Sequence, residues 1–123
     1  MANLTQTTPL NGFDQPIGNM RLREITDLDI TALAIPNNGA TKFKAAIKST
    51  YGLSMPSPLK STADAKTRLL MTQPDQLFAL TRRGANTPID AYITDQTDAW
   101  VLLELSGPAS RTALERICQI DLD

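Results

Sequence analysis

The chain has 123 residues, of which 41% are hydrophobic and 20% are charged, a composition that suits one globular domain and is too short for two cores of ordinary size. Twelve basic and thirteen acidic residues give a net charge of -1, so no field of a single sign is available to attract nucleic acid or an anionic membrane. The absence of histidine and the single cysteine exclude an internal disulfide, a Ser-His-Asp triad and histidine-containing zinc sites.

The first fifth of the chain is predicted to contain little regular structure. Residues 1–19 are rich in Asn, Gln, Thr, Pro and Gly, which indicates a flexible arm, either mobile or bound to a partner. The fold is expected to begin at Met20, where residues 20–25 alternate between apolar and polar side chains. Together with the β-branched residues of 29–36, they predict one bent strand or two short strands.

A helix is predicted next, followed by a loop. Thr41 can cap the helix, and Gly52 suits the left-handed conformation that ends one. Apolar residues recur between them at helical spacing, namely Phe43, Ala46, Ile47 and Tyr51. Pro56 and Pro58 cannot continue the helix, so the polar residues that follow, 59–66, are interpreted as a surface loop.

The middle of the chain predicts a hairpin and a short helix. Two apolar runs within residues 67–83 flank Pro74 and Asp75, which favour the central positions of a β-turn. Further on, Thr87 can act as a helix cap with Pro88 at the first helical position.

The last third predicts a strand, a tight turn and a helix. Residues 99–105 (AWVLLEL) are typical of a largely buried strand, and Pro108 is expected to open a helix over 108–118. Its inward side chains are expected to be Ala113, Leu114 and Ile117. Residues 119–123 then alternate like a strand that has only begun. The sequence as a whole therefore predicts an α+β fold with a mixed or antiparallel sheet, two or three helices and a single domain over 20–123.

Several side chains could form a site, and each also has a purely structural explanation. Carboxylate pairs could hold a hard cation or simply cap turns, Cys118 could be a reactive thiol or a small core residue, and the turn before Pro108 could bind an anion or only connect strand to helix. An arginine pair could bind an anionic partner or be solvated. The carboxylate pairs and the arginines are Asp27 with Asp29, Asp95 with Asp98, and Arg82 with Arg83. No nucleotide or phosphate-loop motif occurs, and no catalytic, cofactor-binding or metal residue is assigned.

No apolar run approaches the roughly 20 residues that cross a bilayer. The first residues also lack the basic leader and apolar core of a secretory signal. We therefore expect a cytoplasmic protein without a membrane span.

Four segments after residue 20 carry a resemblance to a known family. They are LREITDLDITALAIP, YGLSMPSP, TRLLMTQPDQLFAL and TDQTDAWVLLELSGPASRTALERICQIDL. In this order they resemble the gamma subunit of heterotetrameric sarcosine oxidase, and the most specific part of the resemblance runs over residues 94–122. The sequence departs from the family pattern at Gln119, where proline is frequent, and by ending at Asp123.

The resemblance implies a fold and a complex. The fold would be similar to the folate-binding domain of the glycine-cleavage T protein, and incomplete at the C-terminus, so the chain is expected to be an N-terminal piece of a longer subunit. The complexes oxidatively demethylate sarcosine to glycine, with hydrogen peroxide and formaldehyde or methylene-tetrahydrofolate as further products. FAD, FMN, NAD and tetrahydrofolate would lie on partner subunits, and the partners would be the alpha, beta and delta subunits.

On this basis the chain is interpreted as an accessory, interface-forming subunit without catalytic residues of its own. The expected contact residues are Trp100, Tyr92, Met55 and Pro56, since aromatic and apolar side chains are enriched at interfaces, although a tryptophan at the start of such a strand is more often a core residue. The alternative is a stand-alone folate-binding protein of one-carbon transfer, with Asp95 and Asp98 as the nearest candidates to bind a pterin edge.

Overall fold

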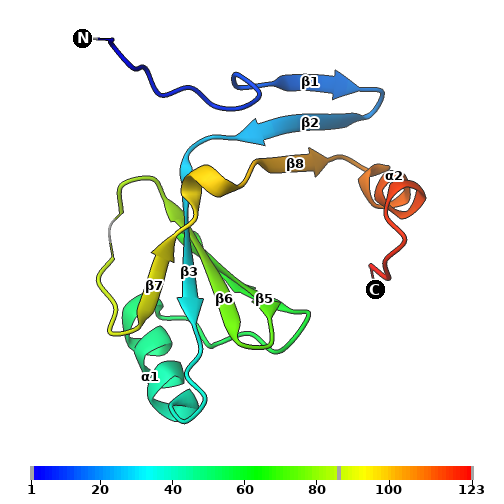
Figure 1. Cartoon of the computed structure of the whole chain (residues 1–123). Helices are drawn as coiled ribbons and strands as arrows, with labels where there is room; N and C mark the ends of the chain where they lie inside the picture. Colours follow the sequence, from blue (N-terminus) through cyan, green and yellow to red (C-terminus); the bar gives the residue numbers. More distant parts are fainter. Residues whose placement is uncertain (1, 86, 123) are drawn as a thin grey trace. The chain divides into compact units, whose positions relative to one another are not determined.

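The computed structural model describes residues 2–85 and 87–122, and their contacts divide the chain into two compact units. Unit 1 combines the described parts of 1–26 and 101–123, whereas unit 2 is the continuous segment between them, 27–100 (Figure 1). The sequence predicted one domain over 20–123. The prediction that both units fold together as a single domain stays a prediction.

Unit 2 contains a five-stranded antiparallel sheet in the order β4-β5-β6-β3-β7 (Figure 1). The predicted hairpin is confirmed, because β5 and β6 pair antiparallel around Pro74 and Asp75. The strands are β3 (Leu28–Ala34), β4 (Ser61–Ala63), β5 (Thr67–Gln73), β6 (Gln76–Arg82) and β7 (Tyr92–Asp95), and a 3₁₀ turn, η1 (Thr97–Ala99), follows the last of them.

Helix α1 (Ala40–Tyr51) supplies the core of unit 2 together with the sheet. Its Phe43 and Ile47, one turn apart, are buried, as the helical spacing predicted. They pack against the buried strand residues Leu33, Leu69, Leu77 and Ala79. The remaining predicted face residues, Ala46 and Tyr51, are half-buried.

The ends of α1 differ in how well the sequence predicted them. Gly52 is left-handed at φ 70° and its N–H donates to Lys48 O at 3.0 Å, as expected of a helix stop. The prediction of Thr41 as N-cap is wrong, since Gly39 holds that position without a side-chain hydrogen bond. The Gly39 N–H donates a hydrogen bond to Pro36 O and so closes a turn before the helix. The helix therefore starts two residues earlier than a cap at Thr41 would require.

Two other predictions for unit 2 are wrong, and tertiary pairing explains both. The segment 59–66 was expected to be a loop, but β4 lies within it and pairs with β5. Thr87 and Pro88 begin no helix; residues 87–91 are irregular and lead into β7, which pairs with the free edge of β3. Edge pairing satisfies backbone groups that a short isolated helix would leave open at both ends.

Unit 1 contains a three-stranded antiparallel sheet in the order β1-β2-β8, and helix α2. Their bounds are β1 (Asp14–Ile17), β2 (Met20–Ile25), β8 (Leu102–Ser106) and α2 (Ser110–Ile117). The alternation of residues 20–25 is confirmed as a strand, and 20–25 and 29–36 form two strands of different sheets.

The α+β class is thus confirmed, with two α-helices and two antiparallel sheets among the described residues. The likeness to a T protein stays a prediction.

The predicted arm over residues 1–19 is partly structured, because it contains β1 and a turn held by Glu24. The Glu24 carboxylate accepts the Gly12 N–H at 2.9 Å and the Leu10 N–H at 3.1 Å. The Thr8 hydroxyl above all, and then these two N–H groups, hold the pKa of Glu24 below its usual value in spite of burial. Composition alone could not reveal this long-range contact.

Glu24→Gln is expected to make the stability of the protein less dependent on pH. Because the carboxylate has a lowered pKa when folded, its contribution is present above the ordinary pKa of glutamate and is lost as pH falls toward the folded value. The wild type should therefore lose more free energy of unfolding than Glu24→Gln between neutral pH and acidic pH. Urea unfolding at a series of pH values measures this, with Glu115→Gln on the exposed face of α2 as the control.

The C-terminal part of unit 1 is far more exposed than the sequence predicted. Residues 99–105 do not form a largely buried strand: no residue of β8 is buried, and Leu103 is 53% exposed. Helix α2 begins at Ser110, two residues after Pro108, and Ile117 on its expected inner face is 76% exposed. Residues 119–122 form no strand. Burial of apolar residues requires a second layer, and none covers them within the part of the chain that the structure describes.

Candidate functional site

The sheet of unit 1 has one charged face. Side chains alternate along β2, so Arg21 and Arg23 point to the same side as their neighbours on the flanking strands. Arg21 forms an ion pair with Asp14 on β1, and Arg23 Nε donates to Glu104 Oε1 on β8 at 2.7 Å. In each pair, the hydrogen bond from the arginine is the main cause that holds the pKa of Asp14 and of Glu104 below its usual range. The positive and negative charges on this face therefore neutralise one another.

The opposite face of the same sheet is largely apolar, with Gln15 and Glu24 as its polar members. The register places Leu22 opposite Leu105, and Ile17 opposite Met20, all on the side away from the arginines. Leu103 shares this side and pairs with Glu24, where the N-terminal turn reaches the sheet. Ile17 is 45% exposed and none of the apolar members is buried. We call these five residues, Ile17, Met20, Leu22, Leu103 and Leu105, the apolar face of unit 1.

Helix α2 adds further uncovered apolar side chains. None of its residues is buried, and Leu114, Ile117 and the following Ile120 are all exposed. Figure 1 shows α2 beyond the end of β8 rather than over the sheet. Monomers rarely expose contiguous apolar surface of this kind without a partner. Both features of unit 1 are thus typical of a surface that another protein covers.

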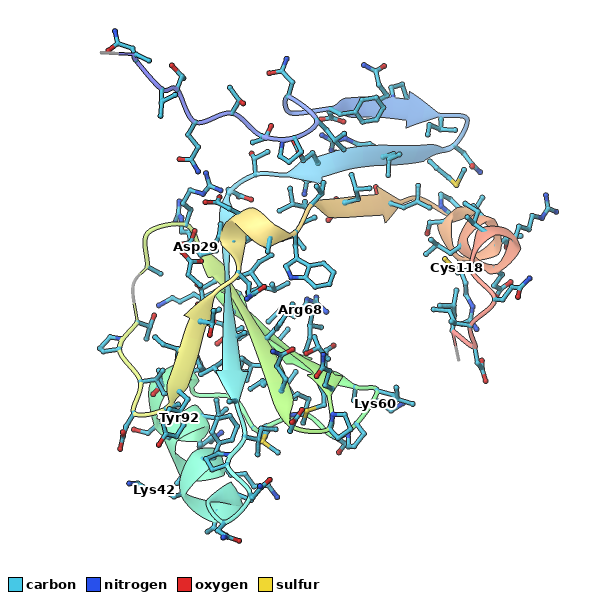
Figure 2. All side chains as sticks on the ribbon, in the orientation of Figure 1. Asp29, Lys42, Lys60, Arg68, Tyr92 and Cys118 are labelled. Carbon is cyan, nitrogen blue, oxygen red and sulfur yellow. The ribbon has the colours of Figure 1, made fainter. Side chains whose placement is uncertain are left out.

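The four predicted interface residues differ in accessibility. Tyr92 on β7 is 76% exposed (Figure 2), and Trp100 is 56% exposed. The Trp100 ring meets the Phe78 ring edge-on, with centroids 5.7 Å apart, so it combines core packing with an exposed surface. Met55 is half-buried against the core of unit 2, and Pro56 is buried. Their role in partner binding stays a prediction.

Sequence reasoning missed the apolar face of unit 1, although the alternating pattern of β2 contains a signal for it. Met20 and Leu22 occupy alternate positions of a strand, as one buried face requires. What the sequence could not reveal is that β1 and β8 extend this face on both sides of β2.

One carboxylate of each pair proposed as a cation site accepts a hydrogen bond within a turn. Asp29 accepts the Gly84 N–H at 2.8 Å and lies 3.8 Å from Arg83 Nε. Asp95 accepts the Thr97 N–H at 3.0 Å, and this bond, followed by one from the Thr97 hydroxyl, lowers the pKa of Asp95. No three or more Cys, Asp or Glu side chains gather into a possible metal site in residues 2–85 and 87–122.

The remaining candidates have structural explanations. Cys118 is half-buried directly after α2, where its N–H donates to Leu114 O at 2.8 Å (Figure 2). Gly107, in the turn between β8 and α2, has a φ of 113° and lies against the backbone of Asn19 and Met20. The turn is thus shaped by packing within unit 1. No helix in the described part of the chain is long and apolar enough to cross a membrane.

Comparisons with known proteins are informative among solved structures. No family model and no curated protein matches the chain. Among solved structures, it is similar to a chain of the heterotetrameric sarcosine oxidase from Corynebacterium sp. U-96, solved in complex with pyrrole 2-carboxylate, with 22% identity and a TM-score of 0.67. The match covers 87% of this chain and 60% of that one. The protein therefore shares its fold with part of a chain from a sarcosine oxidase, over somewhat more than half of that chain's length.

Proposed function

We propose that the chain is a gamma-like, accessory subunit of a heterotetrameric sarcosine oxidase complex. The observation that carries the proposal is the shared fold with a chain of such a complex over most of this sequence. The uncovered apolar face of unit 1 supports it, because a subunit of an assembly leaves apolar surface for its partners.

In this proposal the chemistry belongs to the assembly. The complex would oxidatively demethylate sarcosine to glycine, with hydrogen peroxide and formaldehyde or methylene-tetrahydrofolate as products. FAD, FMN, NAD and tetrahydrofolate would be held by alpha-, beta- and delta-like partners. This chain offers no flavin or nucleotide motif and no histidine, so its contribution would be to bind and position those subunits.

The apolar face of unit 1 is the surface we expect the partners to cover. Ile17 and Leu103 are its most exposed members, at 45% and 53%, so charges placed there should disturb a partner more than the fold of the free chain. Burying an unpaired ammonium group against an apolar partner is strongly unfavourable. Trp100 and Tyr92 remain the proposed contacts on unit 2.

Co-purification with the alpha-, beta- and delta-like subunits of the same cell tests the proposal. Wild-type protein should be retained by the flavin-bearing partners, and Leu103→Lys should reduce retention at least tenfold. Leu59→Lys is the matched control, since Leu59 is 96% exposed and lies outside the apolar face. Thermal unfolding of each free variant separates loss of binding from loss of folding. Retention of Leu103→Lys at the wild-type level would exclude this face as the contact surface.

A reconstitution experiment tests the accessory role itself. The isolated chain should have no sarcosine oxidase activity and bind no flavin. The assembly should lose activity or fall apart when the chain is left out. An assembly that works equally well without it would refute the proposed function.

A further inference from the structure

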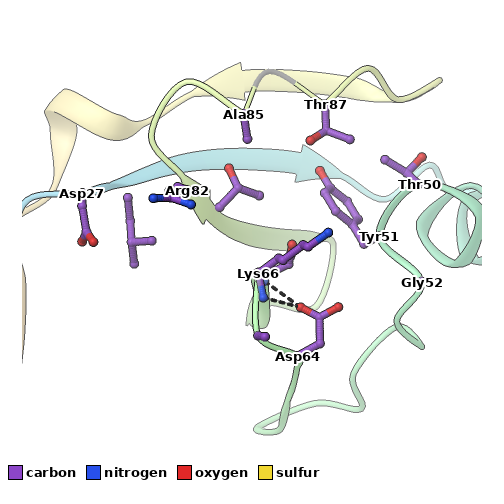
Figure 3. A pocket seen from close by; sticks show the side chains of 13 residues that line it. Asp27, Thr50, Tyr51, Gly52, Asp64, Lys66, Arg82, Ala85 and Thr87 are labelled. Atoms are coloured by element: carbon purple, nitrogen blue, oxygen red, sulfur yellow. Dashed lines mark hydrogen bonds between the residues drawn. The ribbon is translucent and has the colours of Figure 1, made fainter.

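A pocket of about 780 Å³ opens on unit 2, apart from the surfaces described above. Five segments line it: the start of β3, the end of α1, the turn between β4 and β5, the end of β6 and the loop that follows it (Figure 3). This volume is in the range of small-molecule sites. None of the four predicted interface residues lines it, and neither does Asp95 or Asp98.

The strand register explains why the pocket is lined with hydroxyl groups. Leu69 on β5 pairs with Ala79 on β6, and both contact α1 in the core. Two residues further along the same face, Thr67 pairs with Thr81, and both line the pocket together with the last residues of α1. The helix thus covers the apolar part of this face and leaves the threonine pair open to the pocket, where Thr50 and Thr87 add two more hydroxyls.

Two cationic side chains line the same pocket. Lys66 comes from the β4–β5 turn and Arg82 from the end of β6, and neither forms an ion pair with any described residue. Figure 3 shows the Lys66 side chain directed into the pocket on the side of Tyr51. An ammonium group that forms no ion pair, next to hydroxyl donors, can bind an anion.

Neither carboxylate of the pocket forms an ion pair with Lys66, although the ionised Asp64 and Lys66 attract each other. Asp64 Oδ1 accepts hydrogen bonds from the backbone N–H groups of Lys66 and Thr67, both at 2.8 Å, and these bonds stabilise the turn. The Lys66 N–H is the first cause, and the Thr67 N–H the second, that hold the pKa of Asp64 below its usual value. Asp27 lies at the other end of the pocket, nearer Arg82 than Lys66 (Figure 3). The end formed by Lys66 and Tyr51 is therefore rich in donors.

Tyr51 gives this end of the pocket an apolar wall and one more donor. It is the last residue of α1 and half-buried against the core. Burial raises the pKa of its hydroxyl group, which therefore stays protonated at neutral pH and can donate a hydrogen bond. The aromatic ring offers a flat surface to a ligand that also reaches Lys66.

We propose that this pocket binds a small organic anion, with a carboxylate or phosphate group at Lys66 and a flat apolar part against Tyr51. Lys66 supplies the charge, the threonine hydroxyls and Tyr51 donate hydrogen bonds, and the anion competes with Asp64 for Lys66, while Asp27 disfavours a second negative charge at the opposite end. The proposal is independent of the accessory-subunit role, because it involves none of the same residues.

Titration of the isotope-labelled full chain, followed by amide NMR at constant ionic strength and neutral pH, tests this. Benzoate is expected to shift the amides around the pocket with saturation, whereas benzamide, of the same shape without the charge, should bind at least tenfold more weakly. Inorganic phosphate serves as the second probe. Weaker binding of phosphate than of benzoate supports a ring-bearing carboxylate, and binding at least as strong supports a phosphate ligand.

Two variants assign the effect to the pocket. Lys66→Gln should weaken benzoate binding at least tenfold, and Tyr51→Phe about threefold. Lys60→Gln removes the same charge from an exposed lysine outside the pocket and should bind like the wild type. The spectra also show that each variant is folded. Absence of saturable shifts with both anions, equal binding of benzamide, or equal loss in Lys66→Gln and Lys60→Gln would each overturn the proposal.

Discussion

Leu33→Ala is expected to lower the free energy of unfolding of unit 2 by about 3 kcal/mol. Leu33 has no exposed surface and lies on β3, an inner strand between β6 and β7, where it packs against Phe43 and Ile47 of α1. Removing its isobutyl group leaves a cavity that the surrounding helix and strands can fill only in part. The loss therefore combines the transfer free energy of the removed atoms with that of the cavity.

Urea unfolding followed by tryptophan fluorescence measures this change, because the only tryptophan, Trp100, belongs to unit 2 and contacts Phe78. Leu59→Ala removes the same atoms from a side chain that is 96% exposed, and should shift the midpoint very little. A loss below about 1 kcal/mol for Leu33→Ala would mean that the α1 side of the sheet is not a packed core.

Gly107→Ala should be the most destabilising change in unit 1, by roughly 3 kcal/mol. The residue has a φ of 113°, which side chains rarely adopt. A Cβ atom would also overlap with Asn19 O and lie 2.9 Å from Met20 Cα, and both belong to the backbone that leads into β2. Neither can move without disturbing the pairing of β2 with β8.

Gly18→Ala is the matched control, since Gly18 also has a positive φ, at 60°, but has open space where the Cβ would lie. It should cost about 1 kcal/mol, the backbone contribution alone. Hydrogen exchange of the β2 and β8 amides in both variants measures the difference within unit 1. Equal protection in the two variants would show that the close approach at Gly107 does not limit this sheet.

Leu33→Ala and Gly107→Ala together test whether the chain is one cooperative domain. In a single cooperative transition, each substitution lowers the stability reported by probes in both units by the same amount. If the units unfold separately, Leu33→Ala changes only the transition of Trp100 and Gly107→Ala changes only the exchange of β2 and β8.

Local signals in the sequence predicted unit 2 better than unit 1. The turn residues Pro74 and Asp75 specify the β5–β6 hairpin, and the spacing of Phe43 and Ile47 specifies the buried face of α1, because both depend on neighbours in the chain. The failures at Thr87 and in the segment 59–66 have another origin. In each, pairing with a strand distant in sequence decided the conformation.

The candidate sites were predictable only in part. The exposure of Tyr92 and the partial exposure of Trp100 follow from residue type. The exposure of Leu103 and Ile117 does not, because apolar periodicity cannot distinguish a face buried within the chain from one that a partner covers. The pocket was beyond prediction for a different reason. It joins Lys66, Tyr51 and Arg82 from three separate elements, and of these the sequence had suggested only Arg82, as part of an arginine pair that could bind an anionic partner.

The pairing of Ile25 with Leu102 has a consequence for the order in which the protein can form during synthesis. Unit 2 is continuous in sequence and can fold as soon as residue 100 has left the ribosome, whereas β2 must wait for β8, which is made after unit 2. Once unit 2 has folded, the long segment between the two strands is already compact, so less chain entropy opposes their pairing. Until then β2 has an open edge, and the nascent chain is most exposed to mispairing in that interval.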